Sequence, residues 1–211
     1  MNPAEHPLFR CFEHQFVLLM RFHEIEKQNV DVYETDSGAY SFALSDFESH
    51  AGQKYLRELG WRIVEEVAEH LDARCREPDS EKQYEEIADA FHFLIEFFII
   101  CGLTNQDFGS GKRDAMYEIR DEIIEQIGPE SPEEVWAIFI RELGMTLNVL
   151  NTRPHHLKVK PFDYPLFRSR LIRLLEVFLT AAFYAGVPVD RLIDDYFRKA
   201  RINQQRIESG V

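Results

Sequence analysis

Apolar residues recur at helical spacing along most of the chain, and short polar breaks separate the apolar segments. Between residues 53 and 73 they form one stripe, made of Leu56, Leu59, Ile63, Val67 and Leu71. No stretch alternates convincingly between apolar and polar residues at the period of two that is typical of a half-buried strand. The pattern therefore predicts an all-α protein, a bundle of antiparallel helices without a substantial sheet.

The polar breaks divide this pattern into separate elements. Ser131 followed by Pro132 is typical of a helix start, and glycines at 102 and 186 are typical of helix ends. The range 32–52 is the least helical part, and we predict that it forms a loop that closes over a site. The predicted helices span about 8–26, 53–73, 81–101, 114–127, 132–150 and 166–185, with a last helix opened by Pro188.

Composition narrows the class of protein. The chain has 211 residues with 24 Lys+Arg against 37 Asp+Glu, a formal charge of −13, which argues against a nonspecific nucleic-acid binder. Its three cysteines form no CxxC motif and indicate a reducing compartment. The first residues lack the form of a signal peptide, and the longest apolar run is interrupted by Glu96. We expect a cytoplasmic protein that does not span a membrane.

Two pairs of acidic residues stand at helical spacing beside that apolar run. Glu66 and Glu69 are three residues apart on one predicted helix, and Glu86 and Asp89 repeat the spacing on the next. Each pair alone means little, because the same spacing recurs elsewhere in this acidic chain and usually marks a solvated face.

The surroundings of these two pairs change that interpretation. Apolar residues flank both pairs, and the short connection between the two helices predicts an antiparallel hairpin that brings the pairs level. Four converging carboxylates would repel one another by several kcal/mol unless cations bridge them. Oxygen ligands without histidine or cysteine favour Mg²⁺, or Mn²⁺, over zinc. The sequence therefore predicts a divalent-metal site at the hairpin.

The last helix carries a second group of polar residues. Lys199, Asn203 and Arg206 fall on one stripe, and Tyr196 lies one turn earlier. Two cations and an amide on one face suit a phosphate chain and a sugar or base edge. The alternative is an ordinary basic C-terminal helix stabilised by its own dipole.

Three segments together resemble one known family. They are "EVAE" at 66–69, "EIADAFHF" at 86–93 and "YFRKARINQQRIESG" at 196–210. These segments are similar to the motifs of the all-α (dimeric) dUTPases, which include phage dCTPase/dUTPases and form a branch of the MazG-like NTP pyrophosphatases. The resemblance extends from about residue 12 to the end of the chain.

The resemblance implies a role for each candidate residue. The carboxylates of Glu66, Glu69, Glu86 and Asp89 would bind Mg²⁺, and Glu66 or Glu69 would orient or deprotonate the attacking water. The substrate-binding residues would be Lys199 and Arg206 for the phosphates, Asn203 for the nucleoside, Gln15 for the base, and Tyr196. His92 is expected to be a buried structural residue, and Glu96 to lie behind the metal ligands.

The resemblance also implies a reaction, a domain organisation and an oligomeric state. The expected reaction is Mg²⁺-dependent hydrolysis of a deoxynucleoside triphosphate, dUTP first, to the monophosphate and pyrophosphate. The expected protein is a homodimer of single 1–211 domains with a helical insert at about 105–165. The alternatives are a pyrophosphatase for dCTP, a modified pyrimidine or several dNTPs, and a non-catalytic nucleotide-binding dimer.

The sequence departs from the family pattern around the base and the phosphates. Ala200 stands where the family has asparagine, and the segment between the acidic motifs lacks the usual tryptophan pair. These departures leave the choice of base more open than the type of reaction.

Overall fold

The computed structural model describes residues 7–28, 47, 49–78, 80–108, 131–151 and 162–209. These residues form helices throughout and no strands, which confirms the predicted all-α class. The α-helices are α1 (Pro7–Gln28), α3 (His50–Arg76), α4 (Lys82–Ile100), α6 (Pro132–Leu147), α7 (Tyr164–Tyr184) and α8 (Val189–Ser209), with one 3-10 helix, η2 (Asn105–Phe108).

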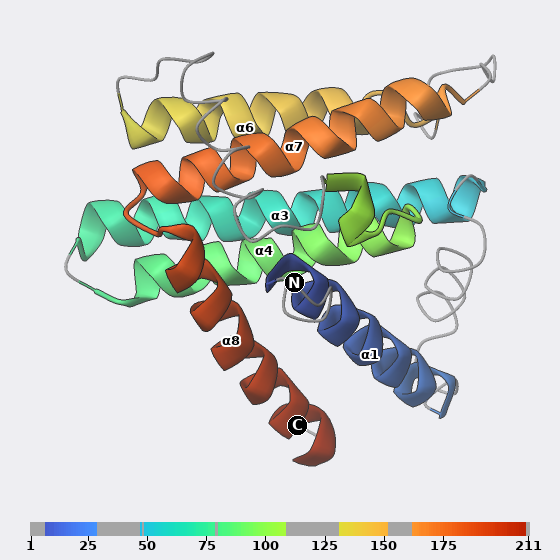
Figure 1. Cartoon of the computed structure of the whole chain (residues 1–211), viewed down its shortest axis with the longest axis horizontal. Coiled ribbons are helices and arrows are strands. Elements are labelled where there is room, and N and C mark those ends of the chain that lie inside the picture. Colours follow the sequence, from blue (N-terminus) through green and yellow to red (C-terminus); the bar gives the residue numbers. More distant parts are fainter. Residues whose placement is uncertain are drawn as a thin grey trace.

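The helices stack in three layers of two. Figure 1 shows α6 and α7 side by side, the α3–α4 hairpin beneath them, and α1 and α8 crossing α4 on the opposite side. α1 and α8 contact each other as well as α4, and their far ends extend away from the bundle. The buried helix α4 therefore lies at the centre of the fold, between the apolar pair α6–α7 and the two crossing helices.

Capping residues start three of the helices. Ser49 accepts a hydrogen bond from the Gly52 amide (3.0 Å), and Ser131 accepts one from the Glu134 amide (3.2 Å), as its sequence context predicts. Asp163 does the same for the Leu166 amide (3.0 Å). This last cap was not predicted: it places Pro165 inside the first turn, so α7 begins at Tyr164 instead of residue 166.

Aromatic packing joins α4 to the outer pair of helices. Phe91 of α4 stacks on Phe178 of α7 with 5.6 Å between ring centroids, and Trp136 and Phe139 of α6 meet the same ring edge-on at 5.7 and 5.3 Å. All four side chains are buried. This packing holds one face of α4 in the core, so that its opposite face is presented to α3, α1 and α8.

Several predicted elements fall outside the described residues. Most of the loop predicted at 32–52, the helix predicted at 114–127 and much of the insert predicted at 105–165 lie there, and they stay predictions. Among the helices that are described, none is long and apolar enough by itself to cross a bilayer; α7 and α8 meet that test only together, across a 99° bend.

Candidate metal and nucleotide site

The α3–α4 hairpin brings three acidic side chains together. One carboxylate oxygen from each of Glu66, Glu86 and Asp89 lies within 4.8 Å of the other two. Glu86 is buried, and the other two are partly buried. α4 supplies two of these carboxylates, at i and i+3, and α3 supplies the third from across the hairpin. The fold therefore brings the two acidic segments together.

The charges of this carboxylate cluster are poorly compensated. Burial, together with the neighbouring charges of Asp89, Glu69 and Glu86, raises the pKa of Glu66 to about 7. Burial also raises the pKa values of Glu86 and Asp89, again with added repulsion from nearby carboxylates. A divalent cation would relieve both effects, since it replaces lost solvation and offsets the repulsion.

Glu69 occupies a different position from the other three acidic residues. Its side chain is exposed and lies outside the group whose oxygens converge. It is nevertheless near enough for its charge to raise the pKa values of Glu66 and Glu86. The structure therefore places Glu69 at the open rim of the carboxylate cluster.

Helix α8 brings positive charge to the same cluster. The Lys199 ammonium lies 2.7 Å from the Asp89 carboxylate, and the two side chains are 18% and 20% exposed. The charge of Arg206, which is exposed two turns further along α8, also lowers the pKa of Asp89. Asn203 lies between them and is partly buried. The predicted polar stripe of the last helix thus includes two cations that act on the carboxylate cluster.

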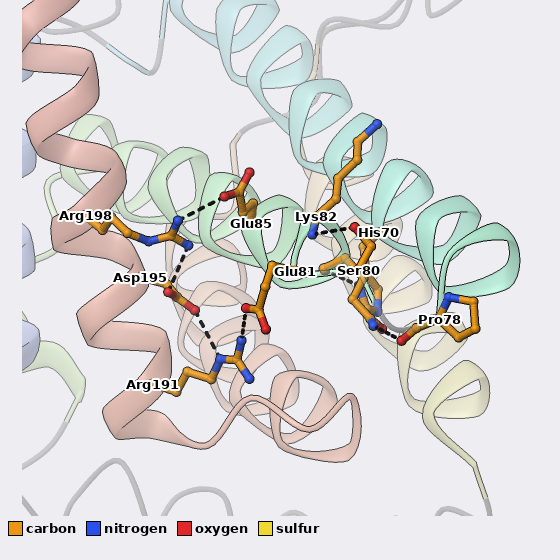
Figure 2. A network of polar contacts seen from close by, with 10 residues as sticks. His70, Pro78, Ser80, Glu81, Lys82, Glu85, Arg191, Asp195 and Arg198 are labelled. Carbon is orange, nitrogen blue, oxygen red and sulfur yellow. Dashed lines mark hydrogen bonds and ion pairs between the residues drawn. The ribbon is translucent and has the colours of Figure 1, made fainter.

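An ion-pair ladder fastens the start of α8 to the start of α4 (Figure 2). Its distances run from 2.5 to 3.4 Å, and each arginine bridges Asp195 of α8 to an acidic residue at the beginning of α4. The members of the ladder, in order, are Glu81, Arg191, Asp195, Arg198 and Glu85. The ladder ends one residue before Lys199, so it sets the register in which that lysine meets α4.

Tyr196 faces the core instead of the carboxylate cluster. Its ring is fully buried and stacks on His92 with 3.9 Å between centroids. Its hydroxyl lies within hydrogen-bond distance of the Cys11 carbonyl (3.0 Å) and of Gln15 Oε1 (3.1 Å). Because the side chain has no exposed surface, this placement does not favour the predicted contact of Tyr196 with substrate. The Tyr196 side chain anchors α8 to α1.

His92 is the buried structural residue that was expected. Its Nε2 lies 3.0 Å from the Tyr196 carbonyl and its Nδ1 lies 3.0 Å from Gln15 Oε1. Burial lowers the pKa of His92 to about 3, so the ring is neutral near pH 7. His92 thus packs between α4 and both crossing helices without adding a charge, and its neutral ring donates its one N–H to one of these two oxygens.

A cavity of about 560 Å³ is lined mainly by residues of α3, between Lys54 and Glu65, with Phe93 and Glu96 of α4. Aromatic side chains and one buried carboxylate are among the residues that line it: Tyr55, Trp61, Phe93 and Glu96. Sequence reasoning placed Glu96 behind the metal ligands and did not single out the aromatic residues. The exposed Trp61, at 63%, was the available signal, because a large exposed apolar side chain often marks a binding surface.

Comparison with known proteins adds an independent finding. A family model described as dUTPase matches residues 66–211, which is more than half of the chain. The chain belongs to the dUTPase family. Comparison with curated proteins and with solved structures gives no match.

Membership of the dUTPase family makes the protein a dUTP diphosphatase-like enzyme whose substrate is a nucleotide. The matched segment begins at Glu66, so it includes the carboxylate cluster and the polar stripe of α8. It leaves out α1 and the first part of α3, and with them Gln15 and Trp61, although the resemblance read from the sequence extended from about residue 12. The base-reading role predicted for Gln15 therefore has no support from the family match.

Proposed function

We propose that this dUTPase-family enzyme hydrolyses a deoxynucleoside triphosphate, with dUTP as the first candidate, to the monophosphate and pyrophosphate in the presence of Mg²⁺. The observation that carries the proposal is the convergence of Glu66, Glu86 and Asp89 within 4.8 Å, with raised pKa values and Lys199 beside them. A cluster of this kind is unfavourable alone and is stabilised by a divalent cation that carries phosphates.

The donor set fits a hard divalent cation. All its atoms are carboxylate oxygens, which Mg²⁺ and Mn²⁺ prefer. The residues that would hold such ions are Glu66, Glu86 and Asp89, with Glu69 joining from the rim. Ions bound there would draw charge from the phosphate oxygens and lower the pKa of a bound water.

The protein groups around the cluster have separate tasks in this proposal. Glu66 or Glu69 orients the attacking water and takes its proton. Lys199 and Arg206 offset the charge of the phosphate chain as pyrophosphate leaves. Asn203, on the same stripe of α8, contacts the nucleoside.

Other features of the enzyme rest on expectation. A homodimer, a cytoplasmic location, a single 1–211 domain and a loop at 32–52 that excludes water from the site follow from the sequence and the resemblance. Each stays a prediction.

The test is pyrophosphate release from a panel of deoxynucleoside and nucleoside triphosphates, with Mg²⁺ and with EDTA. The expected result is release that requires the metal and is confined to one or a few deoxynucleotides. Release from no triphosphate would contradict the proposal and favour the non-catalytic nucleotide-binding dimer. Release that EDTA leaves unchanged would contradict the metal site while retaining the reaction.

A further inference from the structure

A buried hydrogen bond joins α3 to the first turn of α4. His70 Nδ1 lies 2.6 Å from the backbone carbonyl oxygen of Gln83, and the two residues are 0% and 2% exposed. Because a carbonyl oxygen only accepts, the ring carries its proton on Nδ1 and donates it. His70 Nε2 has no hydrogen-bond partner among the described residues, so the imidazole acts on α4 through one atom.

This hydrogen bond and the carboxylate cluster occupy neighbouring turns of the hairpin. On α3, Glu66 precedes His70 by four residues, so the two share one helix face. On α4, Glu86 follows Gln83 by three residues and shares a face with it in the same way. Because the two helices are antiparallel, one turn, about 5 Å along their axes, separates the His70–Gln83 contact from the carboxylates.

The start of α4 depends on tertiary contacts for its position. Its N-cap residue makes no side-chain cap hydrogen bond. The Gln83 side chain donates to the Pro78 carbonyl at 2.5 Å. The Lys82 amide donates to Ser80 Oγ at 3.2 Å (Figure 2). These two bonds order the turn itself, whereas the bond from His70 links the first turn of α4 directly to α3.

A metal site is sensitive to the register of the two helices. Moving one helix by one residue shifts it by about 1.5 Å and turns its side chains by about 100°. Mg²⁺ holds its ligands at about 2.0–2.1 Å in near-octahedral geometry, so a small displacement between α3 and α4 weakens binding. The carboxylates repel one another and favour such a displacement in metal-free protein. A hydrogen bond on the neighbouring turn opposes it.

We propose that His70 is a positioning residue: its hydrogen bond to Gln83 keeps α3 and α4 in the register that lets the carboxylate cluster bind a divalent cation. The inference rests on the proposed function, which requires that cation. His70 acts through the backbone of α4, one turn away from the carboxylates. One hydrogen bond between neutral groups changes an equilibrium constant by about three- to tenfold, which sets the scale of the expected effect on metal affinity.

The test measures the Kd for Mn²⁺ in the wild-type protein, His70→Leu and His70→Asn, from the electron paramagnetic resonance signal of the free ion. This measurement needs no turnover. Leucine removes the donor, whereas asparagine places an N–H donor at about the position of Nδ1. We expect the Kd to rise about three- to tenfold in His70→Leu and to stay within about twofold of wild type in His70→Asn. The Mg²⁺ concentration for half-maximal pyrophosphate release should shift in parallel, with kcat at saturating Mg²⁺ retained.

Thr146→Val is the matched control for lost stability. Thr146 is 0% exposed, and its hydroxyl donates to the Glu142 carbonyl within α6 at 2.8 Å. Valine removes that buried hydrogen bond at nearly unchanged volume, in a helix that supplies no carboxylate to the cluster. Tm measured with EDTA should fall in both Thr146→Val and His70→Leu, whereas the Kd for Mn²⁺ should rise in His70→Leu alone.

The outcomes separate this inference from the proposed function. An unchanged Kd in His70→Leu, or an equal rise in Thr146→Val, overturns the role of His70 while the metal site and the reaction stand. An equal rise in His70→Asn overturns the role of the Nδ1 bond. If His70→Leu does not fold, His70→Gln, whose amide lies nearer to the place of Nε2, takes its place with the same expected contrast to His70→Asn. Wild-type protein that binds no Mn²⁺ overturns the metal site of the proposed function, and this inference with it.

Discussion

Glu86 and Glu96 lie on the same helix and are equally buried, at 8% and 9% exposure, yet their surroundings are opposite. Glu86 faces Asp89 and Glu69, whose charges add to burial in raising its pKa. Glu96 faces the hydroxyl of Tyr55 and the amide of Gln15, which donate hydrogen bonds to it. Other carboxylates raise the pKa of Glu86 although Lys199 and Lys82 act against them, whereas hydrogen-bond donors contact Glu96.

The comparison shows that the partners of a buried carboxylate, and not its burial, indicate what it does. Carboxylates that repel one another need a ligand of opposite charge to be stable. A carboxylate held by donors is already oriented, so it serves as a fixed acceptor for a ligand that arrives later. Glu86 is therefore a candidate ligand for a cation, whereas Glu96 is held in place by its neighbours.

The largest effect is expected for Asp89→Ala. It removes one carboxylate of the cluster and the partner of Lys199, and we expect pyrophosphate release to fall by at least about 1,000-fold, with the helical fold retained. Asp194→Asn, which changes an exposed acidic residue of α8, is the matched control. Wild-type activity in Asp89→Ala would exclude the carboxylate cluster from the reaction.

Lys199→Met should have the next largest effect. The variant keeps most of the side-chain volume but loses the ammonium that lies 2.7 Å from Asp89. If that charge stabilises the departing pyrophosphate, kcat should fall by about 100-fold, since groups that offset developing charge have effects of this size. A change in KM alone, with kcat retained, would show that the lysine only binds the substrate.

Binding of Mg²⁺ should distinguish Glu86 from Glu96 in thermal unfolding. At about 100 times the Kd, a ligand adds about 2.7 kcal/mol to the free energy of unfolding, which corresponds to a Tm increase of about 5–10 °C in a chain of this length. The increase should be lost in Glu86→Gln and kept in Glu96→Gln. Equal increases in both variants would place the metal elsewhere.

The raised pKa of Glu66 predicts a pH dependence in metal-free protein. Its pKa is about 7 in the folded state against 4.5 ordinarily, so the folded state binds the extra proton between these values. Stability should therefore fall as pH rises from about 4.5 to about 7, and the fall should be smaller in Glu66→Gln. Tm measured with EDTA at pH 5, 6, 7 and 8 checks this. An identical slope in both proteins would contradict the raised pKa.

The smallest effect is expected for Arg198→Ala, which cuts the ladder between α4 and α8. Partly exposed ion pairs contribute about 1 kcal/mol or less, so the free energy of unfolding should change little. Because the ladder sets the register of Lys199, kcat should fall several-fold. Arg141→Ala, which removes a comparable exposed pair on α6, should leave kcat unchanged.

The carboxylate cluster could be predicted from the sequence because its geometry is nearly local. Glu86 and Asp89 share one helix face, and the short connection to α3 leaves an antiparallel hairpin as the simple way to pair the helices. The periodicity likewise predicts the helices and their order. The predicted start of α7, at residue 166, is two residues too late. The helix begins at Tyr164 because the Asp163 side chain caps it, and Pro165 is accommodated in its first turn.

The roles of Gln15, Tyr196 and Glu96 could not be predicted in the same way. Each depends on how α1 and α8 cross α4, which brings together residues separated by 77 to 181 positions in the chain. A single sequence carries no periodic signal for such contacts. Whether such a polar side chain can bind a ligand or supports another residue depends on which side chains of other helices contact it.

The sequence by itself therefore determined the helical class, the acidic pairs and the basic stripe of the last helix, because helical periodicity places neighbouring residues on common faces. Only the tertiary structure decided which carboxylates converge, which are held by donors, and that Tyr196 is buried while Glu96 lines a cavity. The reason is physical: the pKa and the hydrogen bonding of a side chain are set by groups from other helices, and helix packing alone decides which groups those are.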